Sequence, residues 1–453
     1  MQPCSDTIQR FFYDFAAERP NDRFLFDEEE SYTVREAYEV VLSLAAQCAA
    51  AGVGEGTPVA LSASRTVRTI LCFFALQLLG AQTVLFDPRD SACGFDFTVK
   101  EGVLSAGGRQ TPLRFAPGSR PAKLAEDNRA PTIVIFTSGS TGEPKTVRLS
   151  QYNFINNSLD TRGIGGYFAD DVNIDVVPIH HVFGLALIFT AVVARHSIFV
   201  PRSVAADDVV RAIIRHRATR LNGVPSLYLA MAGSPLAAQV TSLRCGLIGG
   251  APCTQEQFAY IERRLGITLI PVYGMSECVG ISCGSFRDGA EARRTSVGRV
   301  YSMNTVRIAE DGEILVRSPA MAQGAAGEDG FLHTGDLGYI DEEGYLRVSG
   351  RKKDIIIRNG NNLSALAIEQ KLLQMPQVLD ACVVGVNDEK EGEVPAAAVV
   401  LHAGCRAEDL PFAENMIKPE MPKYWKALAA IPLTATGKPD KQAVRAFFAG
   451  DGR

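Results

Sequence analysis

The chain has 453 residues, of which 46% are hydrophobic and 21% are charged, and its formal net charge is -5. This length predicts roughly two or three domains, and the composition is ordinary for a soluble globular enzyme. The negative charge argues against a general nucleic-acid-binding protein, because such proteins present a basic surface to the phosphates.

The chain shows no sign of secretion or of membrane insertion. Its 10 cysteines are scattered, without a Cys-x2-Cys pair, as is typical of reduced thiols in the cytosol. The N-terminus lacks a basic start followed by an apolar core. The most apolar windows, 69–86 and 182–194, are too short or too interrupted to cross a bilayer, and they predict buried helix and strand. We therefore expect a cytoplasmic protein without a transmembrane segment, and we leave its oligomeric state open.

The N-terminal third alternates helices with short apolar strands. Residues 33–52 have a helical period with Thr33 as the N-cap, and a strand is expected at 58–62. A helix at 65–79 and a strand at 82–86 follow. This βαβ alternation predicts a parallel or mixed sheet.

The middle of the chain changes character twice. Residues 87–130 are polar and have little periodicity, whereas the alternation of strand and helix resumes at 132. Strands are expected at 172–177, 197–200, 219–222, 244–248 and 268–272. Segment 296–350 is rich in glycine and predicts a small β-rich subdomain.

Charged residues after Gly350 predict a domain boundary, with one domain at 1–351 and another at 352–453. The last segment predicts helices at 364–375 and 439–448 and strands at 381–386 and 394–401. The expected fold class is α/β: a large N-terminal domain of βαβ subdomains with a small β-rich subdomain, and a small α+β C-terminal domain.

A hydroxyl-rich loop follows the apolar run 132–136. A strand that ends in such a loop brings N–H and O–H donors close to phosphate oxygens. Its predicted ligands are Thr137, Ser138, Gly139, Ser140, Thr141, Gly142 and Lys145. The P-loop of NTPases is excluded, because Pro144 takes the place of its second glycine and has no N–H. The loop alone leaves kinase, ATPase and ligase open, and a flexible connector is the alternative.

Further segments of specific composition occur at 178–184, 249–252, 272–277, 333–339 and 432–438. Taken in order with the loop, they resemble the adenylate-forming superfamily of acyl-CoA synthetases, adenylation domains and firefly-type luciferases. The resemblance implies that a carboxylic acid attacks the α-phosphate of ATP, that pyrophosphate leaves, and that a thiol captures the acyl-adenylate. It implies ATP, Mg²⁺ and coenzyme A as cofactors.

The resemblance also implies roles for single residues around the nucleotide. Tyr273 would stack on the adenine, and the Ser276 hydroxyl would reach the α-phosphate. Glu277 would hold Mg²⁺ together with Thr141, since this hard cation prefers oxygen ligands. The remaining nucleotide contacts would be Gly250, Ala251, Pro252, Gly274, Met275, Asp336 and Arg351, the last two at the ribose.

Other implied roles belong to the catalytic cycle. Lys438 would bridge the α-phosphate and the acyl carboxylate, and its charge would stabilise the transition state. Lys353 would be the hinge about which a mobile C-terminal domain rotates between half-reactions, and Gly360 lies on the face used for thiol transfer. His181 would stand at the mouth of the acyl pocket. Each of these has a plain structural alternative; Lys353, for example, could be surface charge.

The acid and the acceptor thiol are less constrained. His180 and His181 stand where amino-acid-activating relatives place an aspartate, so a simple carboxylic acid fits better than an α-amino acid. Pocket candidates are Asn222, Val224, Pro225, Cys278, Val279 and Gly280. They permit an aryl or a medium acyl group. Coenzyme A is the favoured acceptor; a carrier-protein phosphopantetheine and a luciferase-like oxygenase are the alternatives.

Overall fold

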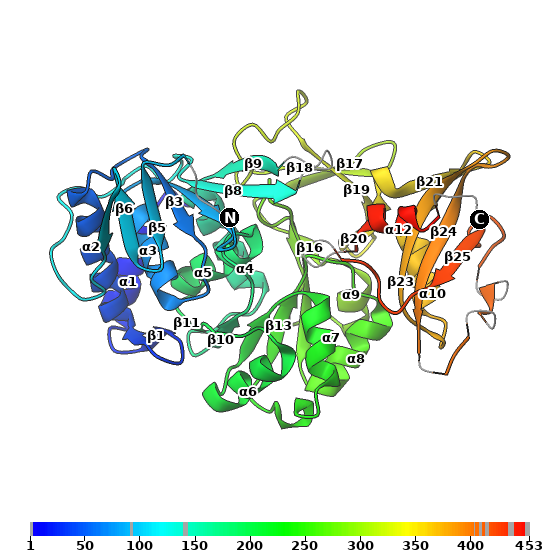
Figure 1. The fold of residues 1–453 in the computed structure, drawn as a ribbon, viewed down its shortest axis with the longest axis horizontal. Coiled ribbons are helices and arrows are strands. Elements are labelled where there is room, and N and C mark those ends of the chain that lie inside the picture. The colour runs from blue at the N-terminus through cyan, green and yellow to red at the C-terminus, as the bar shows by residue number, and fades with distance from the viewer. Residues whose placement is uncertain are drawn as a thin grey trace. The chain divides into compact units, whose positions relative to one another are not determined.

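The computed structural model describes residues 3–90, 94–138, 144–402, 404–406, 410–412, 416–433 and 439–448. The chain divides into two compact units (Figure 1). The larger unit holds residues 1–252, 258–306 and 316–332, and the smaller unit holds residues 253–257, 307–315 and 333–453.

A nine-stranded sheet crosses the larger unit in the order β16-β15-β14-β13-β12-β10-β11-β1-β2. In this order the strands are Arg299–Val300, Ser282–Cys283, Thr268–Tyr273, Cys245–Ile248, Arg220–Asn222, Val172–Asp175, Ser197–Phe199, Arg23–Phe26 and Ser31–Thr33. The strands from β14 to β1 pair in parallel, and β2, β15 and β16 are antiparallel to their neighbours. The parallel centre confirms the expected α/β class.

A second sheet of the larger unit has seven strands in the order β7-β6-β5-β3-β4-β8-β9. These are Arg109–Pro112, Val103–Ala106, Phe97–Lys100, Pro58–Ser62, Gln82–Phe86, Ile133–Ser138 and Pro144–Leu149. β3 and β4 are parallel and joined by a helix, which confirms the predicted βαβ unit. Strands β5 to β7 fall in segment 87–130, where the sequence shows little periodicity and predicts no strand.

The helices of this part of the chain pack on the two sheets. They are α1 Ile8–Glu18, α2 Val34–Ala50, α3 Val67–Leu78, α4 Gln151–Ile164, α5 Val182–Ala194, α6 Ala206–His216, α7 Pro225–Gly233, η1 Ala237–Gln239, α8 Gln255–Leu265 and α9 Ala290–Thr295. Thr33 and Glu36 form a reciprocal capping box at the start of α2. Phe154 of α4 stacks on Phe189 of α5 with ring centroids 4.9 Å apart, inside the core shared by α1 to α5.

The smaller unit is built on two sheets, of which the second contains one parallel pair, β24 with β25, among antiparallel pairs. Strands β17 to β20 form a four-stranded sheet: Thr305–Ile308, Glu313–Arg317, Leu332–Ile340 and Leu346–Arg351. A five-stranded sheet contains β22 Asn361–Ser364, β21 Ile355–Arg358, β24 Gly392–Leu401, β23 Val378–Asp388 and β25 Tyr424–Ala427. The turn η2 Lys352–Asp354 and the helices α10 Ala365–Leu373 and α12 Lys441–Ala446 complete the described elements.

Alternation along β23 places these two helices on opposite faces of the five-stranded sheet. Val383 belongs to one apolar cluster with Ile368 of α10, whereas Val384 belongs to another with Val444 of α12. Successive side chains of a strand point to opposite faces, so one strand contributes to both clusters. This arrangement confirms the predicted α+β module at the C-terminus.

Candidate active site

The loop predicted to bind phosphates connects the antiparallel strands β8 and β9. Thr137 lies opposite Lys145 in their register, and Thr137 Oγ1 donates a hydrogen bond to the Lys145 carbonyl at 3.4 Å. Ser138 pairs with Pro144, and the Lys145 side chain is exposed. The structure thus brings both ends of the predicted loop together and leaves the ammonium accessible to an anion. The described residues do not include Gly139, Ser140, Thr141 and Gly142.

Most other predicted residues of the larger unit follow the carboxyl ends of parallel strands. Segment 178–184 comes after β10, segment 249–252 comes after β13, and Tyr273 is the last residue of β14. Because parallel strands end at the same edge of a sheet, these segments gather at one edge. Ligand sites of open α/β sheets lie at this edge.

The Gly-Gly-Ala-Pro segment after β13 is fixed against β14. A Cβ on Gly249 would lie 2.6 Å from Val272 Cγ2 and 2.8 Å from the Val272 carbonyl oxygen. Gly250 has a φ of +81°, in the left-handed region that favours glycine. Gly250 and Pro252 are exposed and Ala251 is half-buried. The backbone of this segment therefore lies beside β14, the strand that ends at Tyr273.

The segment after Tyr273 is a tight turn. A Cβ on Gly274 would lie 2.2 Å from the Val279 carbonyl oxygen, so this position requires glycine. The Ile281 N–H donates to the Tyr273 carbonyl at 2.8 Å, and the Cys278 N–H donates to the Met275 carbonyl at 3.1 Å. Half-buried on this turn are Tyr273, Met275, Ser276 and Glu277.

Two magnesium ligands are predicted, Thr141 and Glu277, and the structure describes Glu277. Its carbonyl accepts a hydrogen bond from the Ala322 N–H at 2.7 Å, which fixes the backbone beneath its carboxylate. The described residues contain no group of three or more His, Cys, Asp or Glu side chains that could hold a metal. A single carboxylate fits Mg²⁺, because this ion completes its shell with water and substrate phosphates. The donor set therefore fits a metal that arrives with the nucleotide.

The two adjacent histidines lie at the start of α5. Their ring centroids are 4.3 Å apart, and His181 is the N-cap residue. His180 Nε2 lies 3.8 Å from Asp87 Oδ2, and Arg89 Nη2 donates to the same oxygen at 2.6 Å. Hydrogen bonds from Arg89 hold the pKa of Asp87 below its usual range, and burial lowers the pKa of His180. The His180 ring is therefore neutral at pH 7.

The sequence did not identify Asp87 as a neighbour of the two histidines. Asp87 follows β4 in the second sheet, far from the histidines in sequence. Arg89 already pairs with the Asp87 carboxylate. Asp87 is therefore not available as a counter-ion for the α-ammonium group of an amino acid.

A second carboxyl group, Asp175, ends β10 just before the histidines. Burial raises the pKa of Asp175 to about 7, and its Oδ1 has no hydrogen-bond partner among the described residues. Arg65 Nη1 donates to the Asp175 carbonyl at 3.1 Å. A cavity of about 20 Å³, lined by Arg65, Asp175 and Ile179 among others, is large enough for one water molecule. The signal for Asp175 in the sequence was an aspartate at the end of a buried strand.

Two of the pocket candidates are directed into the core. Asn222 is fully buried, donates to Asn173 Oδ1 at 2.8 Å, and accepts the Leu247 N–H at 2.9 Å. Cys278 is also fully buried. Neither side chain faces open space, so their place at the acyl pocket stays a prediction.

The predicted ribose contacts in the smaller unit form a cross-strand pair. Asp336 of β19 lies opposite Arg351 of β20, and Arg351 Nε donates to Asp336 Oδ1 at 2.6 Å. Thr334 Oγ1 accepts the Asp336 N–H at 3.1 Å. The sheet thus fixes the carboxylate in one orientation.

The predicted hinge lies in the turn η2, where two lysines differ sharply. Lys352 Nζ pairs with Asp311 Oδ2 at 2.6 Å and with Glu313 Oε2 at 3.0 Å. Lys353 is exposed and makes no ion pair with any residue in the described ranges. The ion pairs identify Lys352 as the structural lysine and leave Lys353 as the hinge candidate.

The predicted catalytic lysine, Lys438, lies outside the described residues, but both flanks of its segment are placed. Leu433 and Pro439 form an antiparallel bridge, and the Asp440 N–H donates to the Pro432 carbonyl at 2.8 Å. Lys441 Nζ contacts Asp354 Oδ2 of η2 at 2.9 Å. The residues that flank segment 434–438 are therefore paired with each other just before α12.

Known proteins match this chain over nearly its whole length. The family model AMP-binding enzyme matches residues 12–102 and 94–325, and the AMP-binding enzyme C-terminal domain matches residues 367–438. A 2-succinylbenzoate–CoA ligase of Bacillus cereus is 31% identical in an alignment of 450 positions, which covers 91% of this chain and 92% of that protein.

Solved structures agree with the fold. The o-succinylbenzoate CoA synthetase of Bacillus subtilis, solved with its acyl-adenylate intermediate, has a TM-score of 0.81 at 25% identity over 96% of this chain and 97% of that one. ATP-bound MatB from Rhodopseudomonas palustris has a TM-score of 0.84 at 22% identity over 98% of this chain and 99% of that one.

The fold and the strand-edge segments define an adenylate-forming enzyme. The chain belongs to the AMP-binding enzyme family. It is an AMP-forming acid–thiol ligase that uses ATP, Mg²⁺ and coenzyme A to activate a carboxylic acid and transfer the acyl group to the thiol. Within the described ranges no helix is long and apolar enough to cross a membrane.

Proposed function

We propose that the carboxylic acid is an aryl acid of the 2-succinylbenzoate type. The observation that carries this proposal is the match to 2-succinylbenzoate–CoA ligases over 91% of this chain. The site supports it, because Arg89 already engages Asp87, the carboxylate that lies 3.8 Å from His180 and that could otherwise pair with an α-ammonium group.

We propose that the larger unit binds the triphosphate and the base. Thr137 and Lys145 flank the loop that holds the β- and γ-phosphates, Tyr273 stacks on the adenine, and Ser276 contacts the α-phosphate. Glu277 holds Mg²⁺, which neutralises phosphate charge when bound. The loop residues Gly139 to Gly142 and the segment 250–252 complete this set, and His181 borders the acid.

The smaller unit supplies the other proposed contacts. Asp336 accepts the ribose hydroxyls with Arg351 beside it, and Lys438 bridges the α-phosphate and the attacking carboxylate. This displacement needs charge stabilisation rather than a covalent protein intermediate, so lysine and magnesium suffice as catalysts. Lys353 acts as the hinge of a C-terminal domain that begins at residue 352, and the turn at Gly360 serves thiol transfer.

We propose a cytoplasmic enzyme that acts on small molecules and does not bind nucleic acid. The described cysteines are free thiols, and most of them are buried, as suits a reducing compartment. The net charge of -5 gives no general attraction for nucleic acid.

A panel of acids tests the substrate assignment. Pyrophosphate release would be measured with 2-succinylbenzoate, benzoate, octanoate, malonate and phenylalanine as substrates. We expect the highest kcat/KM for 2-succinylbenzoate. A preference of about tenfold or more for octanoate, malonate or phenylalanine would contradict the proposal. Thioester formation would then be compared between free coenzyme A and a holo carrier protein, and faster loading of the carrier would select that acceptor instead.

A further inference from the structure

An exposed turn of the smaller unit is restrained far more than its position demands. Asn359 and Gly360 join β21 to β22 with φ values of +49° and +78°, the two left-handed residues that a type I′ hairpin turn requires. The next residue, Asn361, pairs with Arg358 across the hairpin, and its side chain donates to the Arg358 carbonyl at 3.3 Å. Both turn residues are exposed.

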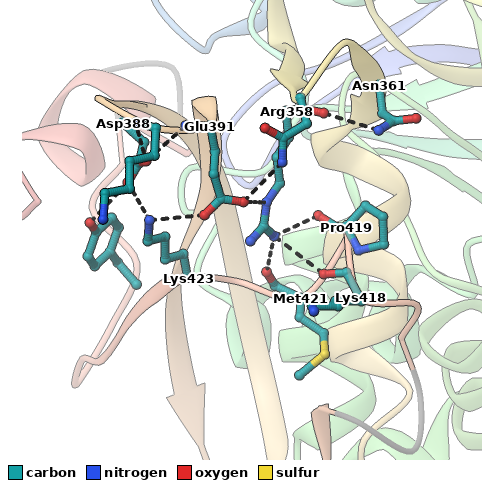
Figure 2. A network of polar contacts seen from close by, with 11 residues as sticks. Arg358, Asn361, Asp388, Glu391, Lys418, Pro419, Met421 and Lys423 are labelled. Atoms are coloured by element: carbon teal, nitrogen blue, oxygen red, sulfur yellow. Dashed lines mark hydrogen bonds and ion pairs between the residues drawn. The ribbon is translucent and has the colours of Figure 1, made fainter.

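A single guanidinium ties this turn to a distant loop. The Arg358 side chain is 12% exposed. Its Nη1 donates to the carbonyls of Pro419 at 2.9 Å, Met421 at 3.0 Å and Lys418 at 3.4 Å (Figure 2). Its Nε donates to Glu391 Oε2 at 2.8 Å. The planar fork of arginine makes this set of contacts, and the point charge of lysine cannot reproduce it.

Glu391 closes the network on the turn itself. The Asn359 N–H donates to the Glu391 carbonyl at 2.8 Å, and Asn359 Nδ2 donates to its carboxylate at 3.3 Å. Lys423 Nζ bridges Glu391 Oε1 at 3.0 Å and Asp388 Oδ2 at 2.6 Å (Figure 2). The hydrogen bond from Arg358 lowers the pKa of Glu391, so the carboxylate is charged at neutral pH.

We infer that Arg358 is a positioning residue for thiol transfer, which it serves by holding the Asn359–Gly360 turn in its left-handed conformation against segment 418–421. A surface hairpin needs no such anchor to fold, whereas a surface that meets a substrate gains from being pre-organised. The inference rests on the proposed function, in which the face around Gly360 takes part in the second half-reaction.

The chain offers a matched control for this clamp. Lys371 Nζ of α10 pairs with Glu420 Oε2 at 2.5 Å, so it holds the same segment from another side. Lys371 makes no hydrogen bond or ion pair with the turn among the described residues. Lys371→Met therefore loosens segment 418–421 and leaves the contacts between Arg358, Glu391 and Asn359 in place.

The test measures the two half-reactions separately in the full chain. Wild type, Arg358→Lys, Arg358→Gln and Lys371→Met would be compared in pyrophosphate exchange and in thioester formation with coenzyme A. For both Arg358 variants we expect thioester formation to fall by roughly 10- to 100-fold, with exchange within about twofold of wild type. For Lys371→Met we expect both rates within about twofold of wild type.

Several results would overturn the inference. Unchanged thioester formation in the Arg358 variants, equal loss of both half-reactions, or the same selective loss in Lys371→Met would each do so. The wild-type protein shows whether a negative result concerns the role of Arg358 or the proposed function. A wild type that forms no thioester overturns the proposed function and the inference together, whereas an active wild type with unaffected variants overturns the inference alone.

Discussion

Asp336 and Arg351 form a register pair across β19 and β20, with Arg351 Nε 2.6 Å from Asp336 Oδ1. The Asp336 side chain is only 7% exposed, whereas that of Arg351 is 51% exposed. The carboxylate is thus fixed by the sheet while the guanidinium reaches solvent. One pair of facing strands holds both proposed ribose contacts.

Replacing Asp336 by asparagine should weaken ATP binding. The substitution Asp336→Asn keeps the size of the side chain and removes the charge that accepts the ribose hydroxyls. Hydrogen bonds to a charged group contribute about 1.5–3 kcal/mol, so we expect the KM for ATP to rise roughly 10- to 100-fold. Asp341→Asn is the control, because Asp341 pairs with Arg347 at 2.8 Å beside the same sheet. An equal rise of KM in both variants would remove Asp336 from the nucleotide site.

Lys438→Ala should abolish most adenylate formation while the protein stays folded. Loss of a charge aimed at the developing transition state costs about 100- to 1000-fold in kcat. Pyrophosphate exchange reports the rate, and circular dichroism with urea unfolding reports the fold. Lys390→Ala, at an exposed lysine of the same unit, serves as the control. Near-normal exchange in Lys438→Ala would exclude this lysine from the mechanism.

Lys353→Pro should separate the half-reactions. Proline fixes φ and hinders rotation of the backbone at the proposed hinge, so adenylation should persist and thioester formation should be lost. Lys352→Met breaks the pairs with Asp311 and Glu313 without restricting the backbone. It should leave the free energy of unfolding nearly unchanged, because Lys352 is half exposed and solvent screens its ion pairs, and it should spare both half-reactions. Parallel loss of both half-reactions in Lys353→Pro would indicate destabilisation instead of a hinge.

Asp175 should make stability depend on pH. Burial raises its pKa to about 7 in the folded protein, against about 3.9 in an unfolded chain. Between these two pKa values the folded state binds more protons than the unfolded state. The stabilising contribution of the protonated Asp175 side chain is therefore complete below about pH 4 and is lost as the pH rises through about 7. Asp175→Asn should gain on the order of 2–4 kcal/mol relative to wild type between pH 4 and pH 8.

Urea unfolding across this pH range checks the Asp175 prediction. Asp127→Asn, at an exposed position, corrects for the general effect of removing a carboxylate. Curves for Asp175→Asn and wild type that run parallel from pH 4 to pH 8 would show that burial does not shift this group.

The parallel part of the fold was predictable because its strands are buried and end in distinctive residues. The strands expected at 172–177 and 268–272 correspond to β10 and β14, and Thr33 caps α2 as its side chain predicts. The segments at the carboxyl ends of these strands could be placed together, since parallel order alone brings them to one edge.

The rest of the molecule depends on contacts that leave no local pattern. All residues of β7 are exposed, so its strand has no alternation of polar and apolar residues to detect. Asp87 meets His180 only through the packing of two different sheets, and Asn222 enters the core because Asn173 and Leu247 satisfy its amide. Residue type alone could not distinguish these outcomes.

Single-turnover analysis of the purified protein with ATP labelled at the α-phosphate, 2-succinylbenzoate and coenzyme A tests whether the enzyme forms an acyl-adenylate and then a thioester. We expect an acyl-adenylate and pyrophosphate first, followed by AMP and the coenzyme A thioester, all dependent on Mg²⁺. Formation of ADP and phosphate, or adenylate formation with no thioester when coenzyme A is added, would contradict it.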